Sequence, residues 1–117
     1  TEREARDAGL AVTLYRWPFA ENDRARATGR TEGFVKVLVD RRSRIVGVTI
    51  VGDHAGELLA PWLLAMRQRL KIGAMVDLVL PYPTLSEASR RVALQSLTPH
   101  LRSPWLRRVL ALLRTLG

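Results

Sequence analysis

The 117-residue sequence contains no cysteine. It can therefore form no disulfide within itself and offers no thiolate to a metal ion or a redox dithiol, which excludes a disulfide-stapled secreted scaffold. No apolar run approaches the roughly 20 residues that a membrane-spanning helix needs, and no charged-then-apolar leader opens the sequence. From these absences we expect a soluble domain in the cytoplasm.

Lysine is also scarce, although the chain is strongly basic. Only Lys36 and Lys71 are lysines among the 19 basic residues, and the formal net charge is +8. The other basic residues are arginines, which are spread along the chain and form no separate tail. Basic domains often bind nucleic acid through its phosphates, but no recognition-helix pattern or stacking aromatic motif accompanies these arginines. Nucleic acid is therefore not the expected partner.

The length allows one domain with a single modest core. The chain begins at Thr1, which has capping-box spacing to Glu4 and predicts a short helix through Asp7. Because a helix start coincides with the first residue, we expect the chain to be a piece of a longer protein. We predict that residues 1–97 form the main domain and that residues 98–117 form a helical extension.

A β-sheet is predicted from three runs of strand-forming residues. The loosely alternating segment 10–17 ends at Pro18 and predicts one strand. Two β-branched runs, Phe34–Val39 and Ile45–Val51, flank a charged turn and predict an antiparallel hairpin. Lys36 in the first run indicates a face that is only partly covered, whereas the second run is apolar on both sides apart from Thr49 and is expected at the sheet centre.

A helix is predicted after the hairpin, at residues 58–70. Its apolar residues recur at helical spacing and form a broad face that includes Leu63. Pro61 fits only if the helix starts late or kinks there, because proline lacks the amide hydrogen that an interior position donates. Gly73 is expected to end this helix.

A second helix is predicted at residues 84–96, with Thr84 as its N-cap. Its expected buried stripe consists of Leu85, Ala88, Val92 and Ala93. Between the two helices, residues 76–80 are apolar and predict either a turn of helix or an edge strand.

The segment 103–116 is a third helix candidate. Its apolar residues fall on one arc, and Arg107, Arg108 and Arg114 lie opposite. Such a helix can pack on its own domain, bind a partner or lie on a membrane surface, and packing on protein is the ordinary interpretation. A basic adaptor that binds an anionic membrane surface or nucleic acid through its arginines and this helix is the alternative function.

The order of the motifs leads to a more specific interpretation. The string EGFVKVLVDRRSRIVGVTIVGDHAGELL, an apolar helix and then PYPTLSEASRRVA resemble the C-terminal dimerisation domain of the pyridine nucleotide-disulfide oxidoreductases. That group contains glutathione reductase, dihydrolipoamide dehydrogenase and mercuric reductase, and the resemblance extends over about Thr1–Leu97. It implies an α+β fold, with an antiparallel sheet covered by helices on one face, whose main role is to pair two subunits.

The resemblance also implies an active-site element. In the disulfide-reducing members, a histidine directly before a Pro-Thr pair and a glutamate five residues after it complete the site of the neighbouring subunit. Here these positions are Tyr82 and Glu87. A phenol, with an ordinary pKa near 10, is a poor base at neutral pH compared with an imidazole near 6.5. Glu87 is better explained as the carboxylate of a capping box with Thr84.

Metal chemistry and other catalytic groups have less support. A tyrosine at the position of Tyr82 contributes to the metal site in the mercuric reductase branch, but that branch ends in a cysteine pair that this chain lacks. His54 and His100 have no second ligand at metal spacing, and Ser86 has no His and Asp arrangement to activate it. We therefore expect no metal site, and no catalytic activity from this chain alone.

The resemblance implies FAD and NAD(P) as cofactors of the full-length oxidoreductase, and a homodimer as its assembly. The chain contains no Gly-x-Gly-x-x-Gly motif and no redox cysteine pair, so the dinucleotide sites are expected in domains upstream of Thr1. The candidates for the subunit contact are apolar residues of the hairpin and of the helix that starts near Thr84, namely Phe34, Val48, Ile50, Leu85 and Val92.

Overall fold

The computed structural model describes residues 1–78, 80–97 and 104–116. Its helices and strands, in chain order, are α1 (Glu2–Asp7), β1 (Thr13–Pro18), α2 (Asp23–Thr28), β2 (Gly33–Val39), β3 (Ile45–Gly52), α3 (Ala55–Arg67), α4 (Gly73–Val76), α5 (Glu87–Leu94) and α7 (Pro104–Leu116). Two short 3-10 turns, η1 (Phe19–Glu21) and η2 (Gln95–Leu97), follow β1 and α5. Among the described residues, no helix has the length and apolar character that crossing a membrane requires.

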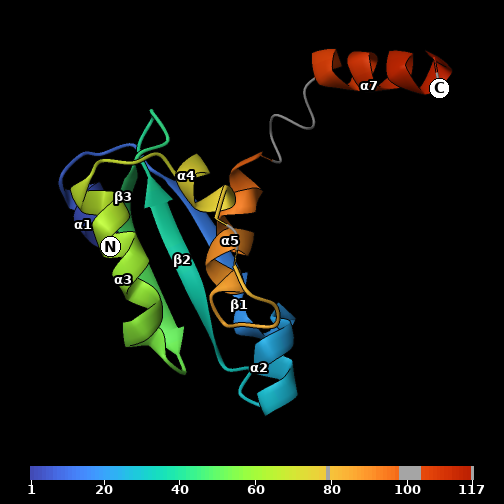
Figure 1. The fold of residues 1–117 in the computed structure, drawn as a ribbon. Helices are drawn as coiled ribbons and strands as arrows, with labels where there is room; N and C mark the ends of the chain where they lie inside the picture. The colour runs from blue at the N-terminus through green and yellow to red at the C-terminus, as the bar shows by residue number, and fades with distance from the viewer. Residues whose placement is uncertain (79, 98–103, 117) are drawn as a thin grey trace.

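The three predicted strands form one antiparallel sheet (Figure 1). β1 pairs with β2, and β2 pairs with β3, so the predicted hairpin is confirmed. Residues directly opposite one another share a face of the sheet. One row across all three strands consists of Trp17, Val35 and Ile50, and it faces the core.

The central strand is β2, so the prediction that β3 lies at the sheet centre is wrong. The strand order is β1-β2-β3, which leaves β3 at an edge of the described sheet. Val46 and Val51 of β3 are 38% and 48% exposed. The apolar run of β3 therefore reflects side chains that the described residues leave uncovered. Composition alone does not distinguish such a strand from one that is buried on both faces.

Helices α3 and α5 cover one face of the sheet (Figure 1). α3 packs on β3, and α5 packs on β1 and β2. Trp62 of α3, Val35 and Val37 of β2 and Val92 of α5 are fully buried between them. Trp62 Nε1 donates a hydrogen bond of 2.9 Å to Ser89 Oγ, which joins α3 to α5 inside the core. The predicted α+β fold with helices packed on one face of the sheet is confirmed.

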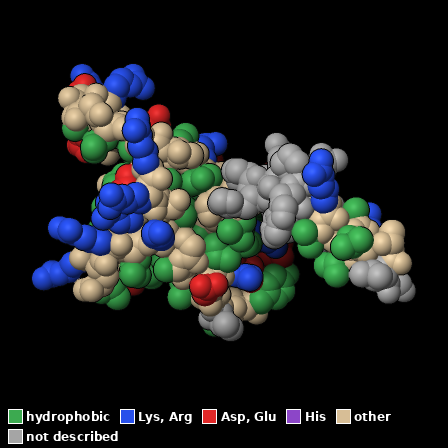
Figure 2. Space-filling view, turned by 90° about the horizontal axis from the view of Figure 1, so that it is seen from above, with side chains coloured by type: hydrophobic (Ala, Val, Ile, Leu, Met, Phe, Trp, Pro, Cys, Tyr) green, Lys and Arg blue, Asp and Glu red, His purple; other side chains and the backbone are tan. Residues whose placement is uncertain are grey.

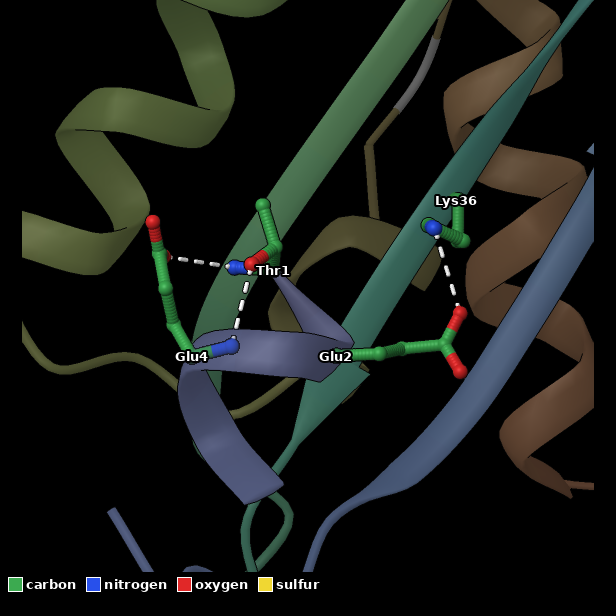
Figure 3. A network of polar contacts seen from close by, with 4 residues as sticks. All are labelled: Thr1, Glu2, Glu4 and Lys36. Atoms are coloured by element: carbon green, nitrogen blue, oxygen red, sulfur yellow. Dashed lines mark hydrogen bonds and ion pairs between the residues drawn. The ribbon is translucent and has the colours of Figure 1, made fainter. Parts of the chain in front are cut away.

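The short helix α1 lies against the opposite face, where Lys36 of β2 points (Figure 3). Lys36 Nζ lies 3.1 Å from Glu2 Oε1, which gives the lysine of the central strand a carboxylate partner. At the start of α1, the Glu4 N–H donates to Thr1 Oγ1, and the Thr1 ammonium donates to Glu4 Oε2. The capping box predicted at Thr1 is therefore confirmed.

Helix α3 begins earlier than predicted. It starts at Ala55, so of the two alternatives given for Pro61 the late start is wrong, and Pro61 lies within the helix. Pro61 has no N–H to donate to the Glu57 carbonyl, which removes one bond from the helix. Burial of Leu58 and Trp62, on either side of the proline, stabilises the helical segment in spite of that loss.

The end of α3 is also different from the prediction. Arg69 adopts a left-handed conformation with φ 54°. Its N–H donates to the Met66 carbonyl, and the Leu70 N–H donates to the Ala65 carbonyl. This pair of bonds is a Schellman motif, which satisfies two of the last carbonyls of the helix. Gly73 does not end α3 but begins the single helical turn α4.

The predicted tail helix is confirmed as α7, which is amphipathic. Leu112 and Leu113 are 62% and 59% exposed, and the side chains of Arg108 and Arg114 are exposed too. Where Figure 2 draws described residues, Lys and Arg side chains project from several separate points, with apolar and acidic side chains between them. This distribution agrees with the spread of arginines along the sequence.

Candidate functional site

The Tyr82 loop, residues 80–86, precedes α5 and carries the tyrosine singled out from the sequence. Tyr82 is 68% exposed, and its hydroxyl donates a hydrogen bond of 2.7 Å to Asp23 Oδ2 in the first turn of α2. The Tyr82–Pro83 peptide bond is cis. A hydrogen bond to an ionised carboxylate is short and directional, so the ring is held in one orientation at the surface.

The surroundings of Tyr82 make its hydroxyl a weaker acid. The hydrogen bond to Asp23 and the charge of that carboxylate raise the pKa of Tyr82 above its ordinary value near 10, with further contributions from desolvation and from the charge of Glu87. At neutral pH the hydroxyl is therefore protonated and donates to Asp23. In this arrangement it acts as a hydrogen-bond donor and not as a proton acceptor.

Asn22 holds the Tyr82 loop against α2, and sequence reasoning missed it. Its Oδ1 accepts a 2.9 Å bond from the Ala25 N–H, and its Nδ2 donates a 3.1 Å bond to the Thr84 carbonyl. Asn22 is only 3% exposed. An asparagine directly before an acidic residue at a helix start is a frequent N-cap pattern, so the cap was recognisable in the sequence. The bond to Thr84 joins residues 62 positions apart, so it was not recognisable in the sequence.

The capping box predicted for Thr84 and Glu87 is wrong. Thr84 Oγ1 donates to the Pro81 carbonyl at 2.8 Å and accepts no N–H from the helix. α5 begins at Glu87, and the side chain of its N-cap residue Ser86 makes no capping hydrogen bond. Glu87 is thus the first helical residue, where a carboxylate interacts favourably with the helix dipole. No hydrogen bond joins Glu87 to Tyr82 among the described residues.

A surface hollow of about 450 Å³ opens beside the Tyr82 loop. Its lining includes Arg24 and Thr28 of α2, Pro83 and Thr84 of the loop, and Asp53 and His54 of the turn between β3 and α3. His54 Nε2 lies 3.5 Å from Asp53 Oδ2, and Arg30 Nη1 lies 3.1 Å from the same oxygen. The hollow therefore combines charges of both signs. His100 lies outside the described residues.

The predicted subunit-contact residues lie mostly in the core of the chain itself. Val92 is 0% exposed, so it cannot contact a second chain, and the prediction for it is wrong. It belongs to the inner stripe of α5 together with Ala88 and Ala93, as the helical spacing indicated. Three others are half-buried and pack against the same core, namely Val48, Ile50 and Leu85. Phe34 is half-buried on the opposite face of the sheet.

Two large apolar side chains of α3 are exposed instead. Leu63 and Leu64 are 54% and 63% exposed, and they lie opposite the buried Leu58, Trp62 and Ala65. The prediction that Leu63 belongs to the buried face is wrong, because the helix is anchored through Trp62. The next residue along a helix is turned by about 100° from it.

The described residues include no group of three or more His, Asp or Glu side chains that could hold a metal ion. A dinucleotide phosphate commonly binds at the N terminus of a helix that follows a strand. Helix α3 follows β3, but Asp53 precedes it and Glu57 lies in its first turn. Carboxylates at these positions repel a pyrophosphate, so these residues do not fit FAD or NAD(P).

Comparison with known proteins relates the chain to one group. The family model described as pyridine nucleotide-disulphide oxidoreductase, dimerisation domain, matches residues 1–93. The mitochondrial dihydrolipoyl dehydrogenase of Caenorhabditis elegans is 39% identical over 94 residues, and the dihydrolipoyl dehydrogenase of Trypanosoma brucei brucei is 41% identical over 95 residues. Each alignment covers 80% of this chain but only 19% and 20% of the relative. The chain thus spans about a fifth of the length of the curated relatives it matches.

Solved structures relate the chain to the same group of proteins. The HOCl-induced flavoprotein disulfide reductase of Escherichia coli matches with a TM-score of 0.75 and 26% identity, over 80% of this chain and 22% of that chain. A NAD-dependent persulfide reductase of A. fulgidus matches with a TM-score of 0.68 and 19% identity, over 85% of this chain and 19% of that chain. The second likeness concerns the fold alone.

Proposed function

The chain belongs to the dimerisation-domain family of the pyridine nucleotide-disulfide oxidoreductases, and from this premise we propose that it pairs two copies of a larger FAD-dependent, NAD(P)-linked oxidoreductase. The observation that carries the proposal is the family match over residues 1–93. It is supported by a fold in which the sheet and two packed helices share one buried core. The proposed location is the cytoplasm.

The proposed contribution of the Tyr82 loop is to position groups and not to transfer protons. Tyr82 stands where the disulfide-reducing members carry a histidine, and its hydroxyl already donates to Asp23 at 2.7 Å. Its raised pKa keeps the phenol protonated at neutral pH. Tyr82 can therefore present an aromatic ring and a fixed hydroxyl to a neighbouring subunit, while Glu87 has no imidazole to orient.

The cofactors of the whole oxidoreductase are proposed to bind outside this chain. FAD and NAD(P) follow from the family, whereas the turn before α3 carries Asp53 where a pyrophosphate would approach the helix. We therefore assign no step of the flavin chemistry to the residues described here.

Self-association of the full chain tests the proposed function. Light scattering over chain concentrations from about 1 to 100 μM should give the mass of a dimer, because dissociation constants of specific homodimers commonly lie in or below this range. A closed two-fold dimer shows no larger species as the concentration rises. A mass that stays monomeric throughout contradicts the proposal.

A second candidate function is favoured by the exposed leucines of α7. Leu112 and Leu113 lie on a helix that also exposes Arg108 and Arg114. An amphipathic helix with arginines on its polar face can lie on an anionic membrane surface. Binding to phosphatidylserine vesicles should then fall steeply with salt and disappear when Arg107, Arg108 and Arg114 are neutralised. Binding that ignores both changes excludes this function.

A further inference from the structure

The outer face of α3 is built differently from its inner face. We use the name α3 outer face for Glu57, Ala60, Leu63, Leu64 and Arg67, all of which are exposed. The two leucines in its middle are 54% and 63% exposed. Apolar side chains that gather on one face, with charges at its ends, are typical of a protein contact. The α3 outer face is therefore expected to contact another protein surface.

We propose that the α3 outer face docks on the same face of a second copy of this chain, with the two α3 helices antiparallel about a two-fold axis. The inference rests on the proposed function, because that function requires two copies to pair. It replaces the hairpin and α5 residues expected from the sequence with a helix face that is accessible in the folded chain.

The charges of α3 fit an antiparallel pair. Glu57 lies in the first turn and Arg67 in the last turn of the 13-residue helix. When two copies run antiparallel with matched centres, Glu57 of each copy lies opposite Arg67 of the other, which forms two identical ion pairs. Neither residue forms an ion pair within the described part of the chain, where the salt bridges involve other residues. Both charges are therefore available to a second copy.

The sizes of the apolar residues fit the same arrangement. With Glu57 opposite Arg67, the register places Ala60 of one copy against Leu64 of the other. A small residue opposite a large one lets two helices approach to the 8–10 Å that separates packed helix axes. Parallel pairing would instead place each Glu57 beside Glu57 of the second copy, which is repulsive. The antiparallel arrangement thus satisfies both packing and charge.

The core side of α3 makes this face rigid enough to dock. Leu58, Trp62 and Ala65 are buried against the sheet, and the hydrogen bond from Trp62 Nε1 to Ser89 Oγ ties the helix to α5. Little conformational entropy is lost when a face already held by the core is covered. Leu63 and Leu64 are therefore presented in a defined geometry.

The first test places a charge in the centre of the face. Leu64→Asp in the full chain should weaken dimerisation by about 100-fold or more in sedimentation equilibrium, because each dimer would bury two unpaired carboxylates. Leu10→Asp is the matched control, since Leu10 is 56% exposed in the loop between α1 and β1 and should leave dimerisation unchanged. Circular dichroism of both variants checks that the fold is retained.

The second test exchanges the charges and probes the antiparallel register. Glu57→Arg and Arg67→Glu should each weaken dimerisation by roughly 10-fold, because each places like charges opposite one another. The double variant restores opposite charges and should return to within about 3-fold of the original chain. Additive weakening in the double variant overturns the antiparallel register.

The outcomes separate this inference from the proposed function. An original chain that remains monomeric at every concentration overturns the proposed function, and the inference with it. An original chain that dimerises together with a Leu64→Asp variant that dimerises equally well overturns only the assignment of the contact to α3. Loss of dimer in Leu64→Asp, but not in Leu10→Asp, supports both.

Discussion

Tyr82 and Leu64 are exposed to a similar extent, at 68% and 63%, yet they belong to two differently built surfaces. The Tyr82 loop is tied to α2 by polar bonds, from Tyr82 to Asp23 and from Asn22 to Thr84. Within the described residues, the side chains of the α3 outer face make no such bonds, and the position of this face comes from the apolar side chains beneath it. Exposure alone therefore does not identify a binding surface. An exposed side chain that is held by hydrogen bonds presents a polar atom in a fixed direction. An exposed side chain that is held by packing beneath it presents an apolar area.

Removing the Trp62 side chain should disturb both surfaces at once and have the largest effect on the free energy of unfolding. Trp62→Ala should lower the free energy of unfolding by about 3–5 kcal/mol, because it empties a fully buried site and leaves Ser89 without its partner. Urea unfolding at a fixed chain concentration measures the loss. Trp62→Phe, which keeps most of the volume, should lose less. A loss below about 1 kcal/mol for the alanine variant contradicts the role given to the core beneath α3.

Removing Asn22 should release the Tyr82 loop and leave α3 unaffected. Asn22→Ala should cost about 1–2 kcal/mol of unfolding free energy, because a buried cap and the bond to Thr84 are both lost. Asn22→Asp keeps the capping oxygen but not the donor to Thr84, so its loss should be smaller. Dimerisation should be the same in all three proteins. Equal losses in the alanine and aspartate variants would show that the cap contributes nothing.

Neutralising Asp23 should change the pKa of the Tyr82 hydroxyl. In Asp23→Asn the pKa of Tyr82 should fall towards its ordinary value near 10, because the carboxylate that raises it is gone. An ultraviolet pH titration measures this, with Tyr82→Phe identifying the Tyr82 component. Since the folded-state pKa lies above that of the unfolded chain, this interaction stabilises the fold fully below pH ~10 and is lost as pH rises through the folded-state pKa. Identical Tyr82 titration curves in the original chain and in Asp23→Asn would exclude Asp23 as the cause of the raised pKa.

The smallest effect on stability is expected for Leu64→Ala. Because Leu64 is 63% exposed, the unfolding free energy of the monomer should change by no more than about 0.5 kcal/mol, while dimerisation weakens. Unfolding of a dilute sample, below the dimer dissociation constant, separates the two quantities. A loss above about 1.5 kcal/mol in the monomer would place Leu64 in the core and remove the contrast with Tyr82.

Much of the fold was predictable because its signals are local. The capping box at Thr1, the hairpin, the inner stripe of α5 and the tail helix each depend on residues a few positions apart. The errors share a cause. The strand order, the exposure of Leu63 and the mistaken assignment of Val92 to the subunit contact depend on which elements pack together, and an apolar side chain has the same composition whether or not something covers it.

The candidate site was predictable only in part. Tyr82 was identified from its place in the family motif, and its weakness as a base from the chemistry of a phenol. Its hydrogen-bond partner Asp23 lies 59 positions away and carries no local signal of that contact. Thr84 shows the opposite failure. The local sequence pattern predicted that it caps the following helix, but its hydroxyl donates to the Pro81 carbonyl instead.

The sequence by itself determined the family and most of the helix and strand segments, and the resemblance implied that Tyr82 stands at the position of a family histidine, since these depend on residue types and short spacings. The tertiary structure alone decided that β2 is central, that Asn22 and Asp23 hold the Tyr82 loop, and that α3 presents its leucines outward. The physical reason is that hydrogen bonds and burial between distant segments exist only once the chain has folded, when the core takes one side of each amphipathic element and leaves the other to solvent or to a second copy.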